Sequence, residues 1–333
     1  MKIISRLLLL TIFLAACGPV TPAMPQPEVS GTYEYQDFAY DIVWSQDEAL
    51  VALTTLTGLY VYDVKTYAEL FAFKQDGGWG AVFGKNYLAA FNNQGVTVWE
   101  LERFREVLHV DGSFASLAFS PDDETIALAE ENKISLIELP SGKVKSTFEV
   151  EIAVADMKFK NAERLIVANS FMDNVQEWDL VNQKSVRKFE FPRPVITLRL
   201  SSDASLVLVD YGMTGFQLWD VATGRIHHNY GDIVSASGWQ RLSGDNKYAV
   251  VWGYAYDGQK SGMSVWDLDI HMKTWEFATP YVNGDGWRNG SLNSDGSILA
   301  AGDNQGYVYF YNMQDGSEIG KFYLPYKYVV QKG

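Results

Sequence analysis

One structural unit recurs seven times between residues 62 and 312. Each copy is an apolar, β-rich stretch that ends in an aromatic or aliphatic residue, followed in six copies by Asp or Glu. The seven pairs are Tyr62-Asp63, Trp99-Glu100, Ile137-Glu138, Trp178-Asp179, Trp219-Asp220, Trp266-Asp267 and Tyr311-Asn312. Successive pairs lie 37, 38, 41, 41, 47 and 45 residues apart. A period near 40 residues is typical of propeller blades, which stack on one another to bury their apolar faces.

Each unit is expected to contain four short strands. In the third unit these are 115–119, 125–129, 133–139 and 144–149, with a tight turn of Ser and Asp residues after the first strand. Similar turns stand at 45–48, 120–123, 201–204, 243–246 and 293–296, and glycines precede the third strand at Gly58, Gly95, Gly215, Gly262 and Gly306. No segment shows sustained helical periodicity. The sequence therefore predicts an all-β fold: a single domain over residues 31–333, a seven-bladed β-propeller of four-stranded antiparallel blades.

Several of these units resemble a known family. The strings FSPDDETIALA (119–129), LWDVATG (218–224) and VWDL (265–268) look like blades of WD-repeat β-propellers, and the resemblance covers nearly all of residues 31–324. It implies that the seven pairs are architectural, with the aromatic residue in the core between blades and the acidic residue capping a turn. No Gly-His pair precedes the first strand of any unit. The family's Asp-His-Ser-Trp hydrogen-bond network is therefore not expected here.

Two ways of closing the ring are compatible with the sequence. Residues 318–324 look like the fourth strand of the last unit, and residues 32–36 also look like a strand. Either the N-terminal strand completes the seventh blade, or every blade is contiguous in sequence and residues 31–36 lie along an edge.

The first seventeen residues resemble the signal of a bacterial lipoprotein. Lys2 and Arg6 precede an apolar run over 7–14, which is too short to span a bilayer, and the string LAAC ends at Cys17. In that class of protein the cysteine is diacylated and becomes the first residue after cleavage. The sequence thus predicts a signal peptide over 1–16 and a membrane anchor at Cys17. The alternative is an ordinary secreted protein whose signal ends near a cysteine.

Residues 17–30 are expected to link this anchor to the propeller. Prolines stand at positions 19, 22, 25 and 27, which favours an extended tether on the order of 30 Å long. A flexible leader of mixed conformation is the other interpretation. The predicted location is the cell envelope of a bacterium, either on the outer side of the cytoplasmic membrane or in the outer membrane.

Charge and cysteine content limit which partners the protein can bind and what can stabilise its fold. Residues 1–16 hold two of the 27 basic residues and none of the 41 acidic ones, so their removal would change the net charge from −14 to −16. A surface of this sign repels phosphate backbones, and nucleic acid is not an expected partner. Cys17 is the only cysteine. Once it is lipidated the folded part has no disulfide, and stability must come from packing.

Catalytic and metal-binding signatures fail on spacing. The segment around Gly78, Gly84 and Lys85 departs from a phosphate loop in glycine spacing and lacks its hydroxyl residue. The four histidines, His109, His227, His228 and His271, show no clustering along the chain, and adjacent residues on a strand point to opposite faces. They are expected to be ordinary surface or interface residues. The sequence predicts no enzyme activity, no cofactor and no metal.

The two longest intervals indicate a candidate binding patch. Their extra length is expected in the connection over 254–262 of the sixth unit and in the connection over 279–287 that enters the seventh. In WD-repeat propellers both kinds of connection leave the same face. The candidate ligand-binding residues are Tyr254, Tyr256, Asp257, Tyr281, Asn283, Asp285 and Arg288. Tyrosines among amides and acids suit recognition of a peptide or a sugar. The other interpretation is that these are only long, tyrosine-rich loops.

The resulting hypothesis is a lipid-anchored binding or scaffold protein, monomeric as a propeller, that holds a protein or glycan on one face. Within the binding class the alternative is an outer-membrane assembly factor, although the repeat of the known propeller lipoprotein of that machinery is different. In the enzyme class the alternative is an envelope hydrolase or lyase with a site in the central channel. Such a site requires converging acids, histidines or metal ligands.

Overall fold

The computed structural model describes residues 31–75, 80–151, 154–169, 174–212, 215–230, 235–254, 260–280 and 287–332. Within these ranges the chain forms thirty β-strands, β1 to β30. The chain divides into two compact units: residues 34–328, and a smaller unit whose described residues are 31–33 and 329–332. The larger unit holds seven four-stranded antiparallel sheets, which confirms the predicted seven-bladed β-propeller.

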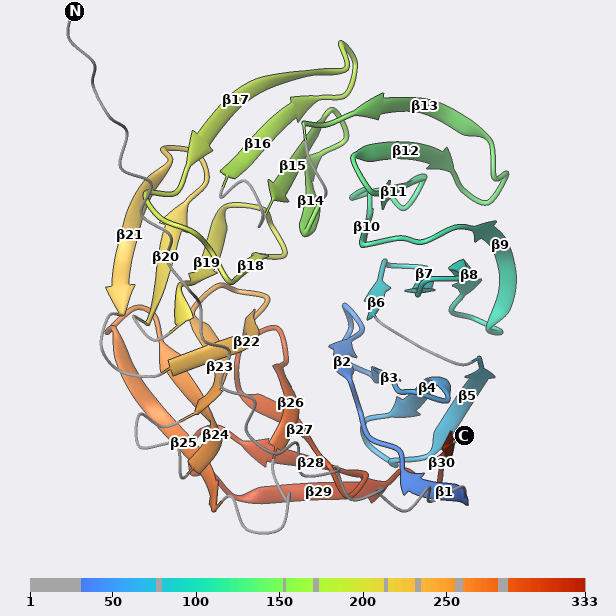
Figure 1. Ribbon diagram of the computed structural model, residues 1–333, viewed down its shortest axis with the longest axis vertical. Helices are drawn as coiled ribbons and strands as arrows, with labels where there is room; N and C mark the ends of the chain where they lie inside the picture. The colour runs from blue at the N-terminus through green and yellow to red at the C-terminus, as the bar shows by residue number, and fades with distance from the viewer. Residues whose placement is uncertain are drawn as a thin grey trace, which may run out of the picture. The chain divides into compact units, whose positions relative to one another are not determined.

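Each blade uses four consecutive strands, labelled a to d from the inside of the ring outward (Figure 1). Blade one contains β2 (Asp41–Trp44), β3 (Leu50–Thr54), β4 (Gly58–Asp63) and β5 (Glu69–Lys74). Blade two contains β6 (Gly80–Phe83), β7 (Tyr87–Phe91), β8 (Gly95–Glu100) and β9 (Arg105–Asp111). Blade three contains β10 (Ser116–Phe119), β11 (Thr125–Glu130), β12 (Lys133–Glu138) and β13 (Val144–Glu149). Blade four contains β14 (Asp156–Asn161), β15 (Arg164–Asn169), β16 (Asn174–Asp179) and β17 (Lys184–Glu190).

The remaining blades follow the same order. Blade five contains β18 (Thr197–Leu200), β19 (Leu206–Asp210), β20 (Phe216–Asp220) and β21 (Arg225–Tyr230). Blade six contains β22 (Ser235–Leu242), β23 (Tyr248–Tyr254), β24 (Lys260–Asp267) and β25 (Met272–Pro280). Blade seven contains β26 (Trp287–Leu292), β27 (Ile298–Asp303), β28 (Tyr307–Asn312) and β29 (Glu318–Tyr323).

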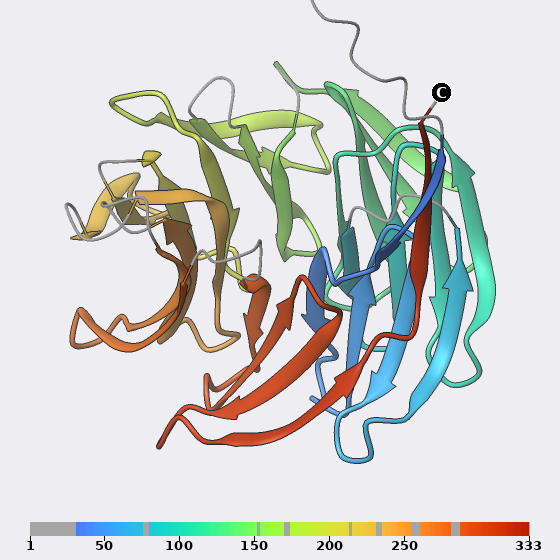
Figure 2. The same ribbon diagram turned by 60° about the horizontal axis from the view of Figure 1, so that its bottom comes forward.

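The first and last strands belong to none of the blades. Strand β1 (Gly31–Gln36) pairs with β30 (Lys327–Lys332) in a separate two-stranded sheet, and the two strands run side by side in Figure 2. Blade seven has its own fourth strand, so every blade is contiguous in sequence. This confirms the second of the two closures considered from the sequence. Strand β30 was not predicted.

The ring of the larger unit closes through inner strands and through a set of hydrogen bonds. The inner strand of each blade contacts that of the next, and β26 contacts β2 to complete the circle (Figure 1). The Gln36 amide nitrogen donates to the carbonyl oxygens of Leu324 and Tyr326, at 2.7 and 2.9 Å. The Asp37 backbone N–H also donates to Tyr326, whose ring stacks on Tyr60 at 4.0 Å. The two ends of the propeller are thereby joined without sharing a blade.

The hydrophobic core lies between blades. Seven buried clusters occur in the described residues, and each is made by two neighbouring blades. The recurring residue before Asp or Glu takes part in all seven, at Tyr62, Trp99, Ile137, Trp178, Trp219, Trp266 and Tyr311. Its acidic neighbour caps the following turn in the blades that carry Asp: Asp220 Oδ1, for example, accepts the Thr223 backbone N–H at 2.6 Å. Glu100 instead pairs with Arg105 at 2.9 Å. The architectural interpretation of the Asp-containing pairs is confirmed.

A β-bulge accompanies this residue in every blade. The pairing of strand c with strand d shifts register immediately before the aromatic or aliphatic position, for example between Leu218 and Trp219. A bulge of this kind adds a residue to one strand and increases the local twist. It lets each outer strand bend around the edge of its blade while the aromatic side chain keeps its place in the core.

Strand direction gives the ring two different faces. Because neighbouring strands are antiparallel, the a-to-b and c-to-d turns of every blade lie at one end of the sheets, here called the a–b face. The b-to-c hairpins and the connections to the next blade lie at the other end, here called the b–c face. On the b–c face the hairpin at Gly58 needs a glycine, since its φ is 150° and an added Cβ would lie 2.2 Å from the Phe73 carbonyl oxygen.

Candidate functional site

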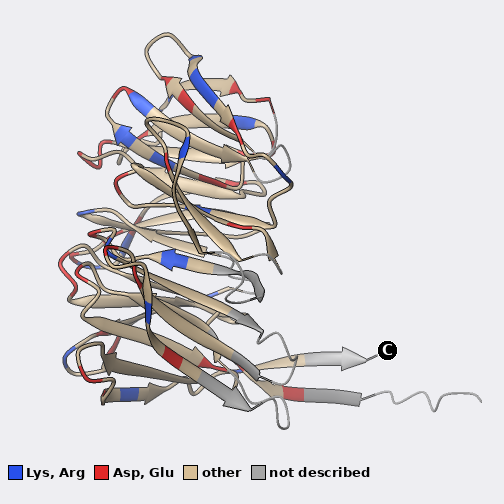
Figure 3. Cartoon of the chain, turned by 90° about the vertical axis from the view of Figure 1, so that its left-hand side faces the viewer, with Lys and Arg blue, Asp and Glu red and all other residues tan. Residues whose placement is uncertain are grey.

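The a–b face is made of short turns that satisfy their own polar groups. In blade three the Ser120 hydroxyl donates to Asp122 at 2.6 Å and accepts the Thr125 backbone N–H at 2.9 Å. Blades one, five and six repeat this pattern, and the hydrogen bond from Ser120 lowers the pKa of Asp122. Figure 3 shows acidic residues along the turns at one side of the ring. We interpret this face as a self-contained acidic surface.

The predicted patch belongs to the b–c face, but most of it falls on residues that the structure does not describe. Tyr256, Asp257, Tyr281, Asn283 and Asp285 lie outside the described residues. Tyr254 is the last residue of β23 and Arg288 the second of β26, and for both only the backbone is described. Trp287, the first residue of β26, packs against the cluster between blades six and seven. The binding role of the patch therefore stays a prediction.

The expected loop bounds are partly wrong. Residues 260–262 belong to β24, and residues 279–280 belong to β25. The pairing of β24 with β23 extends to Ser261 opposite Tyr254. The pairing of β24 with β25 extends to Lys260 opposite Pro280. Much of the extra length of the sixth unit is thus strand. These residues extend the strands instead of forming a longer loop, because strand pairing satisfies backbone N–H and C=O groups that a long loop leaves to solvent.

Blade six consequently projects beyond its neighbours on the b–c face. Its strand c begins six residues before the recurring Trp266, whereas strand c begins four residues before that position in blades one to four and in blade seven. Two extra residues of strand extend the sheet by about 7 Å. Tyr254 is the last residue of β23, at the end of this extension, and residues 281–285 directly follow β25 in the sequence.

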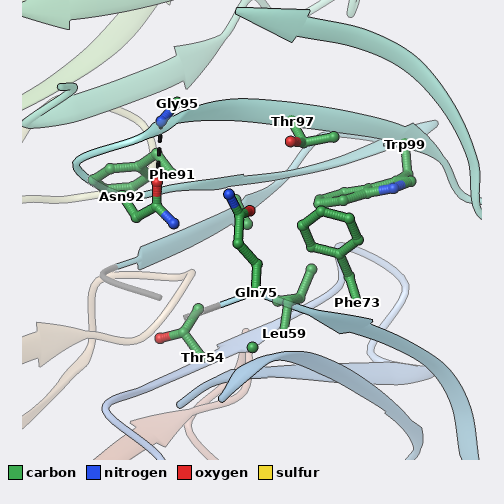
Figure 4. A pocket seen from close by; sticks show the side chains of 11 residues that line it. Thr54, Leu59, Phe73, Gln75, Phe91, Asn92, Gly95, Thr97 and Trp99 are labelled. Carbon is green, nitrogen blue, oxygen red and sulfur yellow. Dashed lines mark hydrogen bonds between the residues drawn. The ribbon is translucent and has the colours of Figure 1, made fainter. Parts of the chain in front are cut away.

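A small cleft opens on the same face between blades one and two (Figure 4). Its apolar wall is made of Leu59, Phe73, Phe91 and Trp99. The rings of Phe73 and Trp99 lie 4.8 Å apart at an angle of 60°. The room inside is about 20 Å³, enough for a water molecule but too small for a cofactor or a large side chain.

Polar groups stand around this wall. Asn92 Oδ1 accepts the backbone N–H groups of Gln94 and Gly95, at 2.8 and 3.0 Å, so the amide has a fixed orientation. Gln75 donates to Gln94 Oε1 at 2.8 Å, and Thr97 shares a hydrogen bond with His109 at 2.9 Å. The cleft therefore combines an apolar wall with polar groups whose orientation is fixed by hydrogen bonds. Sequence reasoning missed this cleft because its residues come from two units. Gly58 and Gly95 were predicted only as hairpin glycines, and Trp99 only as a core residue.

Three of the four histidines gather where blades five and six meet. The rings of His228 and His271 stack with centroids 3.6 Å apart and planes inclined by 6°, and His227 lies 6.5 Å from His271. The Tyr230 hydroxyl is 3.3 Å from His271 Nδ1. His227 and His271 are exposed and His228 is half-buried where the two blades meet. The expected lack of clustering is wrong. His271 lies in the c-to-d turn of blade six, and the packing of blade six on blade five brings that turn beside β21.

Acid is expected to destabilise this contact. Burial lowers the pKa of His228, with His271 and His227 as further causes. The unfolded chain therefore binds a proton at this histidine more readily than the folded protein does. The contribution of neutral His228 to the free energy of unfolding is fully present above the ordinary pKa of about 6.5, and it falls as the pH drops below that value. We expect His228→Gln to flatten the dependence of the melting temperature on pH between roughly 8 and 5.5. His109→Gln, on β9 of blade two and outside this cluster, is the matched control, and an equal slope in the wild type and in His228→Gln would contradict the assignment.

Within the described ranges, no group of three or more His, Cys, Asp or Glu residues is arranged to hold a metal ion. Nor does any helix in the part of the chain that the structure describes have the length and apolar character to cross a membrane.

The fold and the pair pattern define a WD-repeat-like β-propeller. A comparison of sequences agrees: over 209 residues, 59% of this chain, it is 25% identical to apoptotic protease-activating factor 1 of Rattus norvegicus. The match spans 15% of the length of that relative. No protein-family model matches the chain. A propeller of this class is suited to serve as a scaffold for protein–protein interaction.

Proposed function

We propose that this protein is a lipid-anchored interaction module of a bacterial cell envelope, which holds a protein or glycan on the b–c face of its propeller. The projection of blade six is the observation that carries this proposal. A blade that extends about 7 Å past its neighbours offers strand ends and tyrosine-rich connections that the other blades do not. The proposed binding patch consists of the residues predicted from the sequence, namely Tyr254, Tyr256, Asp257, Tyr281, Asn283, Asp285 and Arg288.

The contrast between the two faces supports this choice. Turns on the a–b face are short, and their Ser and Asp side chains are engaged by the turn itself, as at Ser120 and Asp122. A partner would have to break those bonds to use them. The b–c face carries the blade-six projection and also the small cleft between blades one and two, whose wall is apolar.

In this proposal, lipidated Cys17 holds the propeller at the membrane surface. Residues 1–30 lie outside the described residues, so the proposal rests on the sequence LAAC and on the single cysteine at position 17. Two acyl chains bind a bilayer stably, whereas one chain binds only reversibly. A tether over 17–30 then allows the propeller to reach partners on the order of 30 Å from the anchor.

Substituting Tyr254, Tyr256 and Tyr281 together with Ala is expected to abolish capture of the partner. The measurement is a pull-down of the lipidated protein from an envelope extract, with the captured partner identified in the wild type first. Because the three side chains are proposed to be exposed, the melting temperature should stay nearly unchanged. Capture by the wild type should also weaken modestly with salt, since Asp257, Asp285 and Arg288 are charges at the rim.

The matched control removes apolar side chains from the opposite face. Val144, Val181 and Ile270 are 55%, 69% and 60% exposed and stand at or next to c-to-d turns, so their triple Ala variant should capture the same partner as the wild type. Full capture by the tyrosine variant, or equal loss in both triple variants, would refute the proposed patch.

A further inference from the structure

Strand pairing identifies one level of the ring at which all seven inner strands can be compared. In each blade the recurring aromatic or aliphatic residue of strand c pairs with a residue of strand b. The next residue along strand b pairs with a residue of strand a. That residue of strand a defines the level compared here. These seven residues are Val43, Val82, Ala118, Lys158, Arg199, Arg241 and Ser291. Four blades place a small or apolar uncharged residue at this level. Blades four, five and six, which are consecutive, each place a cation.

The three cations form an arc along one side of the ring. Their strands β14, β18 and β22 are neighbours with Cα atoms within 8 Å, as the order of inner strands in Figure 1 shows. Lys158 and Arg199 alternate along their strands with the core residues Met157 and Leu198, so they lie on the opposite side of the strand from those residues. Both are half-buried. Solvent therefore reaches them, although neighbouring blades restrict their surroundings.

Only one of the three has a carboxylate partner among the described residues. Arg241 pairs with Asp41 on the inner strand of blade one, across the width of blade seven. Arg199 donates to the Leu198 carbonyl oxygen at 3.1 Å, and no ion pair within 4.0 Å involves Arg199 or Lys158 in the described part of the chain. The nearby Asp156 uses its two oxygens on the backbone N–H groups of Met157 and Leu200, both at 2.9 Å.

This arrangement stands out against the charge of the whole chain. With 41 acidic and 27 basic residues, a cation has many carboxylates available, and exposed Lys and Arg elsewhere do pair with them. Three cations at one level, two of them without such a partner, form a local positive field on the inside of an acidic protein. Guanidinium and ammonium groups at such a place suit oxygen atoms of carboxylate or phosphate groups.

We propose that Lys158, Arg199 and Arg241 form a binding site, at the inner rim of the ring, for a small molecule that carries two or more carboxylate or phosphate groups. Lys158 and Arg199 hold the ligand directly. Asp41 keeps Arg241 in position in the absence of the ligand and competes with the ligand for that guanidinium. The site is separate from the patch on the b–c face and does not depend on the function proposed for it.

The test is titration calorimetry of the full-length protein at low ionic strength with two probes, citrate for carboxylates and inorganic pyrophosphate for phosphates. Saturable binding of either probe is expected, and the tighter of the two identifies the kind of oxyanion. Lys158→Gln and Arg199→Gln should each weaken binding about tenfold, the size of one charge-assisted hydrogen bond. Lys184→Gln, on the outer strand β17, removes the same charge and should change the affinity less than about twofold.

Two further variants distinguish a specific site from general charge attraction. Asp41→Asn should tighten binding several-fold because it removes the competing carboxylate, while Glu102→Gln, at an exposed position, should leave the affinity unchanged. Lys158→Arg keeps the charge and should keep binding, which separates loss of the site from loss of folding. Absence of saturable binding of both probes by the wild type, or equal weakening by Lys184→Gln and Lys158→Gln, would overturn the proposal.

Discussion

Replacing Trp219 with Ala is expected to lower the free energy of unfolding by about 3 to 5 kcal/mol. The side chain is only 6% exposed and belongs to the cluster between blades four and five. Its ring meets Phe191 edge-on at 5.2 Å, and its indole N–H donates to Gln217 Oε1 at 3.0 Å. The substitution would leave a cavity between two blades and deprive a buried amide of its partner, so both effects act in the same direction.

Denaturant unfolding measures this loss, and a thermal melt provides an independent check. Val181→Ala is the matched control, because that side chain is 69% exposed in the c-to-d turn of blade four and should cost little. An unchanged unfolding curve for Trp219→Ala would mean that the interblade cluster does not hold blades four and five together.

Replacing Cys17 with Ser is expected to abolish retention in the membrane fraction. A hydroxyl cannot take the thioether-linked lipid that a bacterial lipoprotein carries, so the variant should be released or remain as unprocessed precursor. Metabolic labelling with an acyl probe and fractionation of the envelope measure the effect. Since Cys17 is the only cysteine in the chain, no other thiol can carry the label.

A substitution in the same segment controls for damage to the tether. Thr21→Ala leaves the cysteine intact and should be labelled and retained like the wild type. Labelling of Cys17→Ser as strong as that of the wild type would exclude this residue as the site of lipid attachment, and the interpretation of the string LAAC would then be wrong.

Local patterns predicted the blades well. The four strands expected in the third unit agree with β10 to β13 to within one residue at each end, and the Ser120 to Asp123 turn forms as predicted. Both depend on short-range physics, namely the alternation of apolar residues along a strand and the hydrogen bonds of Ser and Asp to nearby backbone. Repetition of the pattern seven times made the assignment of the remaining blades secure.

Features that depend on neighbouring blades were missed or misplaced. The cluster of His228 with His271 joins residues from two blades, and neither sequence neighbourhood shows a metal-like or catalytic spacing. The extension of β24 and β25 was mistaken for loop because Tyr, Gly and Ser residues over 254–262 read as turn-forming. Strand β30 was missed because its partner, β1, lies about three hundred positions away along the chain.

The sequence by itself determined the repeat, the number of blades, the all-β class and the burial of the recurring aromatic residues, because each depends on spacing along a few dozen residues. Only the tertiary structure decided how the ring closes, which blade projects and which side chains share a level. Lys158, Arg199 and Arg241 are separated by about forty residues from one to the next, and the packing of consecutive blades sets them side by side. Their common level follows from strand register, which backbone pairing across each sheet selects and composition does not show.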